Sequence, residues 1–496
     1  MRGMHALPGA LYTAAQVREL DRRAIEELGV PGYELMTRAG HATLNALRSL
    51  WPSARSIAVL CGPGNNGGDG YVVARVAKAQ GLRARVVAVP EASRLQGDAQ
   101  RAYDDFVAAG GRCEPWSPAV LDADVIVDAI YGTGLAREVT GEVAAILEAA
   151  NASGRPIVAV DIPSGLHADT GGVLGVAARA QLTVTFIGRK LGCYLGRAHA
   201  HVGRLVFDDL AVPPETYTAF APSARLLGEP DVEAALPRRP RDAHKGDHGH
   251  VLVVGGGPGM PGAARLAGEA ALRAGAGLVT VAVHPENVGI VAARPELMCV
   301  AARSAADLRG ALERASVLAV GPGLGRSDWA RDLLATALAS GRPAVVDADA
   351  LNLIAELPQR SDRWVLTPHP GEAARLLGWT SAQVQGDRLA ALHELQARYG
   401  GSVVLKGAGT LVLSPGELPR LCDRGNPGMA TGGMGDVLTG VVVGIAAQCG
   451  DLAAAARAGV FAHAQAGDLA ARRGERGLMA GDVLDQVRAC VNPPTA

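Results

Sequence analysis

Short runs of valine, isoleucine and leucine recur through the first half of the chain, and a helical stretch separates each run from the next. The runs between residues 56 and 209 are SIAVLCG, ARVVAVP, DVIVDAIYG, PIVAVDIPSG, LTVTFIG and RLVFDD. Because they do not alternate apolar and polar residues, they are typical of strands buried on both faces. Strands interleaved with helices predict a parallel sheet with right-handed crossovers. A helical pair over residues 13–29 and 33–50 precedes them.

A second series of the same kind begins after residue 247. Its runs are HVLVVGGG, GLVTVAV, VLAVGPG, PAVVDADAL, WVLTPHP and SVVLKGAGTLVLS. The segment between the two series, residues 211–247, is rich in proline and charge and has no sustained period, which indicates a boundary near residues 215–235. At 496 residues the chain is also too long for one ordinary core. We therefore predict two different α/β domains, residues 1–222 and 223–496.

Composition and charge exclude several classes of protein. The net charge is −1 and no basic block occurs, so we expect no binding to nucleic acid. The seven cysteines are scattered without a CxxC pair, which argues against a zinc site and for reduced thiols. The apolar run VLTGVVVGIAAQCG is shorter than a membrane span and predicts a buried helix. We see no signal peptide, and we expect a cytoplasmic protein without a membrane partner.

The stretch CGPGNNGGDG at residues 61–70 follows a predicted strand and precedes a predicted helix. Its glycines match the GxGxxG pattern of dinucleotide-binding turns, but the same pattern recurs at residues 257–262, so the match is weak. Such a turn also needs an acidic residue after the next strand, and Glu91 lies near that place. The carboxylate of Asp69 would repel a pyrophosphate. The side-chain oxygens instead favour a polar ligand or a hard cation, whereas a purely structural reading is a tight turn that needs glycine.

Two further polar loops follow later strands of the same predicted sheet. One is DAIYGTG at residues 128–134, and the other is DIPSG at residues 161–165. Ligands bind at the carboxyl ends of strands in open α/β sheets. Taken singly, Asp128 or Asp161 would more often cap a helix or anchor a loop. Three polar loops at one sheet edge predict a binding site.

These motifs, together with AIEELGVPGYELMTRAG, resemble the NAD(P)H-hydrate epimerase family over roughly the first 210 residues. The resemblance implies a Rossmann-like parallel sheet that binds a hydrated NAD(P)H as its substrate. It implies a potassium ion held by oxygen atoms of Asn66, Asp128 and Ser164. Asp128, or the cation beside it, would polarise the carbon that is epimerised. The substrate contacts implied by the resemblance are Asn65, Asn66, Gly67, Gly68, Asp69, Gly132, Thr133, Gly134, Leu135, Ala136, Arg137, Glu138 and Asp161.

The second half ends in a glycine-rich segment, NPGMATGGMGDVLTG at residues 426–440, just before an apolar helical run. Backbone N–H groups at a helix N-terminus bind anions. Asp436 at that point fits a base that takes a proton from a substrate hydroxyl while the N–H groups hold a phosphoryl group. The alternative is an acidic residue that the helix dipole favours at its N-terminus.

HKGDHGHVLVVGG, GPGLG, LTPHPGE, LKGAGT and NPGMATGGMGDVL resemble the ADP-dependent NAD(P)H-hydrate dehydratase family, which has a ribokinase-like fold. The match covers residues 240–490. The resemblance implies that ADP is the co-substrate, and we expect magnesium with it. His369 could equally be a loop histidine held by its flanking prolines. The implied nucleotide contacts are Lys406, Gly407, Ala408, Gly409, Thr410 and Gly435, and the implied hydrate contacts are Ala263, Gly323, His369 and Asp436.

The sequence thus predicts a bifunctional enzyme that repairs hydrated NADH and NADPH. The first domain would interconvert the two epimers of the hydrate. The second would dehydrate one of them with ADP, giving AMP and phosphate. The expected partners are these small molecules and further copies of the chain in a homo-oligomer. Two alternatives stay open. A stable phosphorylated product would support a ribokinase-like small-molecule kinase, and ligand binding without turnover would support a nucleotide-binding protein without catalysis.

Overall fold

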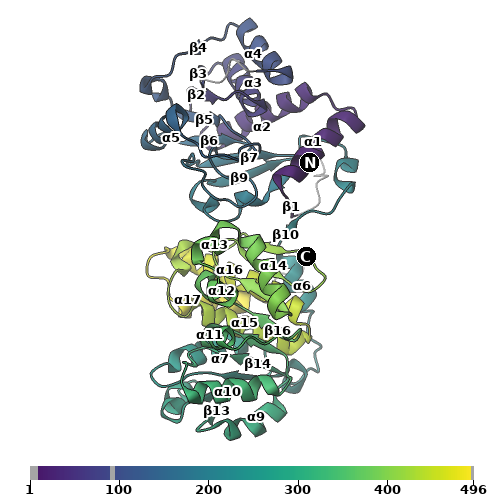
Figure 1. The fold of residues 1–496 in the computed structure, drawn as a ribbon, viewed down its shortest axis with the longest axis vertical. Helices are drawn as coiled ribbons and strands as arrows, with labels where there is room; N and C mark the ends of the chain where they lie inside the picture. Colours follow the sequence, from purple (N-terminus) through teal and green to yellow (C-terminus); the bar gives the residue numbers. More distant parts are fainter. Residues whose placement is uncertain (1–8, 90–94, 493–496) are drawn as a thin grey trace. The chain divides into compact units, whose positions relative to one another are not determined.

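The computed structural model describes residues 9–89 and 95–492, which excludes Glu91. The chain divides into two compact units, Met1–Ala224 and Arg225–Ala496, whose elements are labelled in Figure 1. Each unit holds a sheet with helices against it. The two units are described separately below.

The first unit contains a seven-stranded sheet in which all neighbouring strands are parallel. Each predicted apolar run of the first half forms one of its strands. In spatial order the strands are β4 (Cys113–Glu114), β3 (Arg83–Ala88), β2 (Ser56–Cys61), β5 (Val125–Ala129), β6 (Ile157–Val160), β7 (Leu182–Phe186) and β9 (Arg204–Asp208).

Helices cover both faces of this sheet, as the continuous apolar runs predict. Ile57, Val59 and Cys61 of β2 pack into one hydrophobic cluster, whereas Ala58 and Leu60 pack into another. This alternation follows from the twofold period of a strand. The first cluster includes side chains of α2 (Gly32–Leu50), α3 (Asn65–Ala79) and α4 (Gly97–Ala108), and the second includes those of α5 (Gly141–Ala152).

The N-terminal helical pair is interrupted in a way that the sequence pattern did not indicate. Helix α1 (Ala14–Arg22) continues into a π-helical turn, η1 (Arg23–Glu27), before α2 begins at Gly32. Two strands too short to be predicted, β1 (Ala10–Tyr12) and β8 (Arg189–Lys190), pair in parallel in this unit. This pairing brings Lys190 close to α1, which matters for the site below.

The second unit contains a mixed sheet. Its strands, in spatial order, are β13 (Met298–Ala301), β12 (Leu278–Val283), β11 (His250–Val254), β14 (Val317–Val320), β15 (Ala344–Val346), β16 (Trp364–Leu366), β17 (Ser402–Leu405), β18 (Thr410–Leu413), β19 (Arg420–Cys422) and β10 (Ala224–Leu226). The run SVVLKGAGTLVLS is a hairpin of two antiparallel strands rather than one strand. Its turn needs glycine, because φ is +139° at Gly407 and +66° at Gly409.

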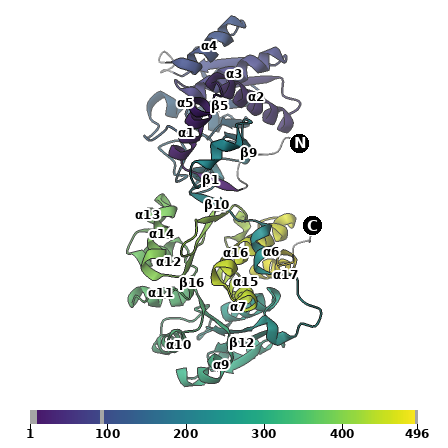
Figure 2. The same ribbon diagram turned by 90° about the vertical axis from the view of Figure 1, so that its right-hand side faces the viewer.

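Two layers of helices enclose this sheet, as Figure 2 shows. One layer packs on Val251 and Val253 of β11 and consists of α6 (Glu229–Ala235), α7 (Pro261–Arg273), α8 (Val288–Ala292), α15 (Met434–Cys449), α16 (Leu452–Ala470) and α17 (Ala480–Cys490). The other helices are α9 (Arg309–Arg314), α10 (Asp328–Ala339), α11 (Ala348–Glu356), α12 (Pro370–Leu377), α13 (Ser381–Gly386) and α14 (Arg388–Tyr399).

The apolar run after Asp436 forms α15, and eleven of its residues are buried. The prediction of a buried helix is therefore confirmed. Across the two described ranges, every helix is too short or too polar to be a candidate for crossing a membrane.

Candidate active sites

The three polar loops of the first unit meet at the carboxyl ends of β2, β5 and β6. Gly62 lies so close to the next loop that a Cβ atom there would overlap the carbonyl oxygen of Ile130. A Cβ at Gly67 would overlap the carbonyl oxygen of Gly62. A Cβ at Gly132 would lie 3.4 Å from Oδ1 of Asn66. Glycine at Gly62 and Gly67 thus allows close backbone packing that brings the first two loops together.

Asp128 and Ser164 join the second loop to the third. Oδ1 of Asp128 accepts a hydrogen bond from the Ser164 hydroxyl at 2.6 Å, and Oδ2 accepts one from the Ser164 N–H at 2.8 Å. Asp128 is fully buried, and burial raises its pKa although these hydrogen bonds oppose the rise. Its carboxylate is therefore held rigidly at the base of the site.

Asn66 supplies a buried polar group that the protein does not satisfy. Its side-chain oxygen and nitrogen are both buried and have no hydrogen-bond partner. Buried polar atoms in native proteins are nearly always paired, so each exception calls for a ligand, ion or water. The side chains of Asn66, Asp128 and Ser164 all carry oxygen atoms, the hard donor type that could hold an alkali cation.

The predicted substrate contacts of the first unit fall in two places. Residues 65–69 form the first turn of α3. The N–H of Gly68 donates to the carbonyl of Gly64 at 3.1 Å, whereas the N–H groups before it have no acceptor within the helix. Residues 132–138 form a mostly exposed loop after β5. Arg18 of α1 reaches this loop, because its Nη1 donates to the carbonyl of Thr133 at 3.4 Å.

Asp161 lies at the end of β6 with a backbone φ of +69°, an unusual value for a residue with a side chain. Its carboxylate pairs with the ammonium of Lys190, which is 1% exposed. The carboxyls of Asp21 on α1 and Asp69 on α3 interact electrostatically with both. Sequence reasoning singled out Asp161 and Asp69 but missed Lys190 and Asp21.

In the second unit, α15 begins at the predicted glycine-rich segment. Gly433 is the N-cap with φ of +88°, so glycine is required there. Asp436 occupies the third helical position, and burial raises its pKa to about 7, with the carboxylate of Asp347 adding to the effect. A carboxyl that exchanges its proton near neutral pH suits a general base.

Lys406 is the cation of this site. Its Nζ lies 2.7 Å from Oδ1 of Asp347 and 3.8 Å from Oε2 of Glu372. Burial opposes the charge of Lys406, but these carboxylates outweigh it and raise the pKa. A Cβ at Gly435 would lie 3.3 Å from the same Nζ. The structure thus brings together Lys406 and Gly435, two of the predicted nucleotide contacts.

Arg388 donates hydrogen bonds to backbone carbonyls in and beside the hairpin turn at residues 406–410. This side chain is 2% exposed, and its Nη2 donates to the carbonyls of Leu405, Lys406 and Gly409 at 3.1, 3.3 and 3.3 Å. Burial lowers the pKa of Arg388 to about 10. No sequence pattern indicates Arg388, because it lies on a helix in an ordinary amphipathic pattern.

The remaining predicted hydrate contacts are Ala263, Gly323 and His369. Gly323 lies against Ala263, since a Cβ there would be 3.1 Å from that of Ala263. His369 is the N-cap of α12, where its Nδ1 accepts from the N–H groups of Gly371 and Glu372 at 3.0 and 3.3 Å. Its role as a loop anchor is therefore present in the structure. Its ring is half exposed, and its other nitrogen, Nε2, lies 3.5 Å from Oε1 of Glu372.

Comparison with known proteins now adds to this geometry. Residues 251–488 match the family model described as NAD(P)H-hydrate dehydratase, and residues 32–192 match the model described as YjeF-related protein N-terminus. The bifunctional NAD(P)H-hydrate repair enzyme of Coxiella burnetii is 49% identical over 97% of this chain and 99% of its own. The Escherichia coli enzyme of that name is 44% identical over 98% and 95%. The chain belongs to the bifunctional NAD(P)H-hydrate repair enzyme family.

A solved structure supports the fold of the C-terminal half. A solved ribokinase-like protein from Enterococcus faecalis is 30% identical with a TM-score of 0.51, and the match covers 55% of this chain and 97% of that protein. The C-terminal half of this repair enzyme is therefore ribokinase-like, as the sequence predicts. The resemblance that its motifs indicated, an epimerase half fused to a dehydratase half, is confirmed.

Two buried carboxylates beside Lys406 were not singled out from the sequence. One is Asp347, which lies in the predicted run PAVVDADAL; it is buried and accepts hydrogen bonds from Lys406 at 2.7 Å and Thr439 at 2.8 Å. Glu372 appeared only inside the motif LTPHPGE. For Asp347 the available signal was a carboxylate directly after a buried apolar strand, the same signal that Asp161 carries.

Proposed function

We propose that this chain converts both epimers of hydrated NADH and NADPH back to the intact coenzymes, with ADP as the phosphoryl donor. The observation that carries the proposal is the cluster of Asp436, Lys406 and Gly435 at the N-terminus of α15. It combines a base, a cation and helix N–H groups, which are the parts that phosphoryl transfer to a hydroxyl requires.

In the dehydratase half, Asp436 takes the proton of the substrate hydroxyl. The hydroxyl oxygen attacks the β-phosphorus of ADP, and AMP leaves. Lys406 and the N–H groups at the start of α15 stabilise the charge on the transferred group. The ring nitrogen then expels phosphate, which leaves far more readily than hydroxide, and a proton departs from the neighbouring carbon. Magnesium, held mainly by the phosphates of ADP, would neutralise part of their charge.

The other predicted contacts complete this site. Residues 407–410 line the hairpin turn that carries Lys406, so they can hold the nucleotide through backbone groups. Ala263, Gly323 and His369 would contact the hydrate. The contact between Gly323 and Ala263 and the half-exposed ring of His369 support this assignment.

In the epimerase half, the hydrate would lie over residues 65–69, 132–138 and Asp161. Asn66, Asp128 and Ser164 would hold a potassium ion, whose charge would polarise the carbon that is epimerised. The unpaired buried amide of Asn66 supports this assignment. The carboxylate of Asp128 accepts hydrogen bonds from the N–H and the hydroxyl of Ser164 and would also face the cation, so Asp128 would act through the charge of that cation.

The test is the recovery of NADH absorbance from a mixture of both hydrate epimers in potassium buffer, with ADP and with ATP in separate reactions. We expect complete recovery with ADP. Recovery that stops partway would show that only the second half is active. No recovery with either nucleotide, or a stable phosphorylated product, would support the kinase alternative instead.

Three expectations stay predictions. The preference for ADP over ATP rests on the family resemblance, and parallel reactions with the two nucleotides test it. A homo-oligomer is expected, and sedimentation velocity would give its size. A cytoplasmic location is expected, and fractionation of the source cells would test it.

A further inference from the structure

Lys190 is a buried cation in the epimerase half that none of the predicted substrate or cation contacts includes. Its Nζ donates to the carboxylate of Asp161, to Oγ1 of Thr185 at 3.1 Å and to the carbonyl of Phe186 at 2.9 Å. All three ammonium hydrogens therefore have an acceptor. Burying a lysine is costly unless it is paired, so this position is built to hold a charge.

Lys190 lies among three carboxyl groups, whereas a simple ion pair contains one. The carboxyls of Asp161, Asp21 and Asp69 come from the loop after β6, from α1 and from α3, and all three interact with one another. Burial raises the pKa of Asp21 to about 7 and that of Asp69 well above its ordinary value, while Lys190 opposes both shifts. A single carboxylate would neutralise Lys190, so a structural ion pair does not explain the other two.

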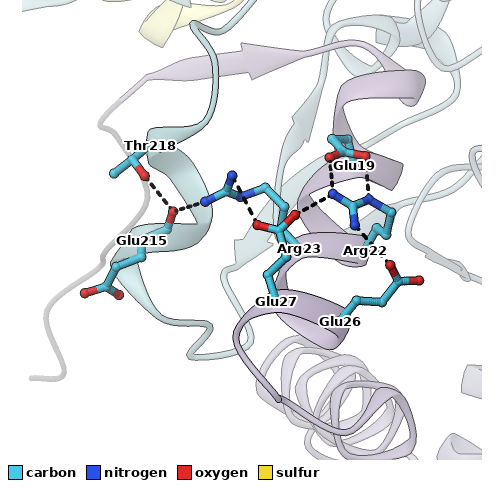
Figure 3. A network of polar contacts seen from close by, with 7 residues as sticks. All are labelled: Glu19, Arg22, Arg23, Glu26, Glu27, Glu215 and Thr218. Carbon is cyan, nitrogen blue, oxygen red and sulfur yellow. Dashed lines mark hydrogen bonds and ion pairs between the residues drawn. The ribbon is translucent and has the colours of Figure 1, made fainter.

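The helix that carries Asp21 is fixed on its other sides. Thr13 and Gln16 form a capping box at its start, and the N–H of Ala14 donates to Asp169 at 2.6 Å. Figure 3 shows a network of ion pairs on the exposed face of α1 and η1, in which Arg22 contacts Glu19 at 2.7 Å and Glu26 at 3.0 Å. The helix is thereby anchored with Asp21 beside Lys190.

The carboxylate of Asp161 is the member of the cluster best placed to react. Its Oδ1 accepts from Lys190 and from the N–H of Phe186 at 3.4 Å, whereas the described residues donate no hydrogen bond to its Oδ2. Its side chain is 14% exposed, compared with 1% for Lys190. Asp128 differs, because Ser164 and Ile130 occupy both of its oxygens. One oxygen of Asp161 is thus available to a substrate in the loop site.

We infer that Asp161 is the base and Asp69 the acid of the epimerisation. Lys190 and Asp21 are positioning residues: Lys190 holds the negative charge of the carboxyl cluster, and Asp21 helps to keep a proton within it. This inference rests on the proposed function, since it assigns the proton transfers of the same site.

The step that these groups support leaves no net change in protons or electrons. Asp161 takes the proton of the hydroxyl, and the C–O bond becomes a carbonyl. The bond from that carbon to the ring nitrogen breaks, its electron pair moves to the nitrogen, and the nitrogen takes a proton from Asp69. After rotation about the adjacent single bond, the nitrogen adds to the opposite face of the carbonyl, and both protons return. No oxidant, reductant or co-reactant is required.

The experiment uses the full chain and each hydrate epimer separately, with ADP, and follows NADH absorbance. The epimer that the dehydratase half consumes directly reports on that half alone. The other epimer must first pass through the epimerase half. A reaction without protein corrects for spontaneous epimerisation. We expect Asp161→Asn, and equally Asp69→Asn, to slow recovery from the second epimer by about 100-fold or more and to leave recovery from the first unchanged.

Lys190→Met should lower kcat for epimerisation by at least about tenfold, with little change in KM, and Lys190→Arg should restore part of the loss. Lys78→Met is the matched control, because Lys78 is an exposed lysine of the same unit. A twofold or smaller effect of Asp161→Asn would overturn the inference, and so would a loss in Lys190→Met that appears only in KM. The near-ultraviolet circular dichroism of Lys190→Met will show whether this variant folds like the wild type. If it does not, the inference is judged on Asp161→Asn and Asp69→Asn, because these substitutions keep the side-chain shape. Failure of the wild type on the first epimer would overturn the proposed function itself.

Discussion

The ammonium of Lys406 lies 2.7 Å from Oδ1 of Asp347, and the other oxygen of that carboxylate accepts a hydrogen bond from Thr439 at 2.8 Å. The pair connects the hairpin turn after β17 with the end of β15 and with α15. Asp347 is 2% exposed, and Lys406 is the cation that pairs with its carboxylate.

Lys406→Met should therefore lower stability as well as activity. It leaves the carboxylate of Asp347 buried without its cation, a change that costs about 3–5 kcal/mol. Urea unfolding of the full chain, followed by tryptophan fluorescence, should show a lower midpoint for one transition. Lys245→Met, which removes an exposed lysine, serves as the control. The double change Lys406→Met with Asp347→Leu should regain most of the lost stability, and no regain would contradict the pairing.

Asp436→Asn should reduce dehydration by about 100-fold or more, because the base is removed while the helix N–H groups stay. The affinity for ADP, measured by titration calorimetry, should change little. Asp451→Asn is the matched control, since Asp451 caps the start of α16 by accepting from Ala453 at 2.8 Å and Ala454 at 3.1 Å. If Asp436→Asn dehydrates the substrate at the wild-type rate, Asp436 is not the base and serves only as an acidic residue that the helix dipole favours.

The pH dependence of dehydration should show one acid limb from Asp436. Burial and the neighbouring Asp347 raise the pKa of Asp436 to about 7, and a base acts only when it is deprotonated. The value of kcat/KM should therefore fall as pH drops through about 7 and level off above it. Because the folded pKa lies above the unfolded one, the folded protein binds more protons between about pH 4 and 7. This carboxyl then makes stability decrease as pH rises across that window. An acid limb unchanged in Asp436→Asn would assign it to another group.

Potassium should raise the melting temperature of the first unit through Asn66. A ligand that binds only the folded state stabilises it by about 2.7 kcal/mol at a hundredfold excess over its Kd. Thermal unfolding in potassium chloride and in choline chloride of equal ionic strength tests this. Asn66→Leu should abolish the difference between the two salts, since it removes an oxygen donor and an unpaired buried amide. An equal salt effect in Asn66→Leu would place the cation elsewhere.

Arg388→Met should weaken ADP binding by about tenfold or more without changing the chemistry at Asp436. The change removes the guanidinium donor from the buried carbonyls of Leu405 and Gly409, and a buried carbonyl left unsatisfied costs about 1–3 kcal/mol. The turn that presents Lys406 then loses its support. Calorimetry gives the affinity, and kcat at saturating ADP should stay within a few-fold of wild type. A large fall in kcat with unchanged affinity would contradict this account.

The sequence predicts the main strands and the site loops because both depend on local patterns. Continuous apolar runs such as SIAVLCG give buried strands, and glycine-rich polar segments give loops at their carboxyl ends. The short strands β1, β8 and β13 carry no such pattern; β13, for instance, has an exposed methionine at its first residue, Met298. The run SVVLKGAGTLVLS predicts one strand because apolar residues continue on both sides of its glycines, whereas the positive φ of Gly407 and Gly409 turns the chain back into a hairpin.

The amino-acid sequence by itself determined the two α/β halves, the family and the loops that hold the candidate sites, since short motifs carry that information. The tertiary structure decided which charged groups share a site. Lys190, Asp21 and Asp161 are far apart in the chain and meet only because β8 pairs with β1 beside α1. Asp347 joins the candidate site only because the ends of β15 and β17 bring it to Lys406. Burial and proximity set the charge state of such groups, and both arise from packing between distant segments.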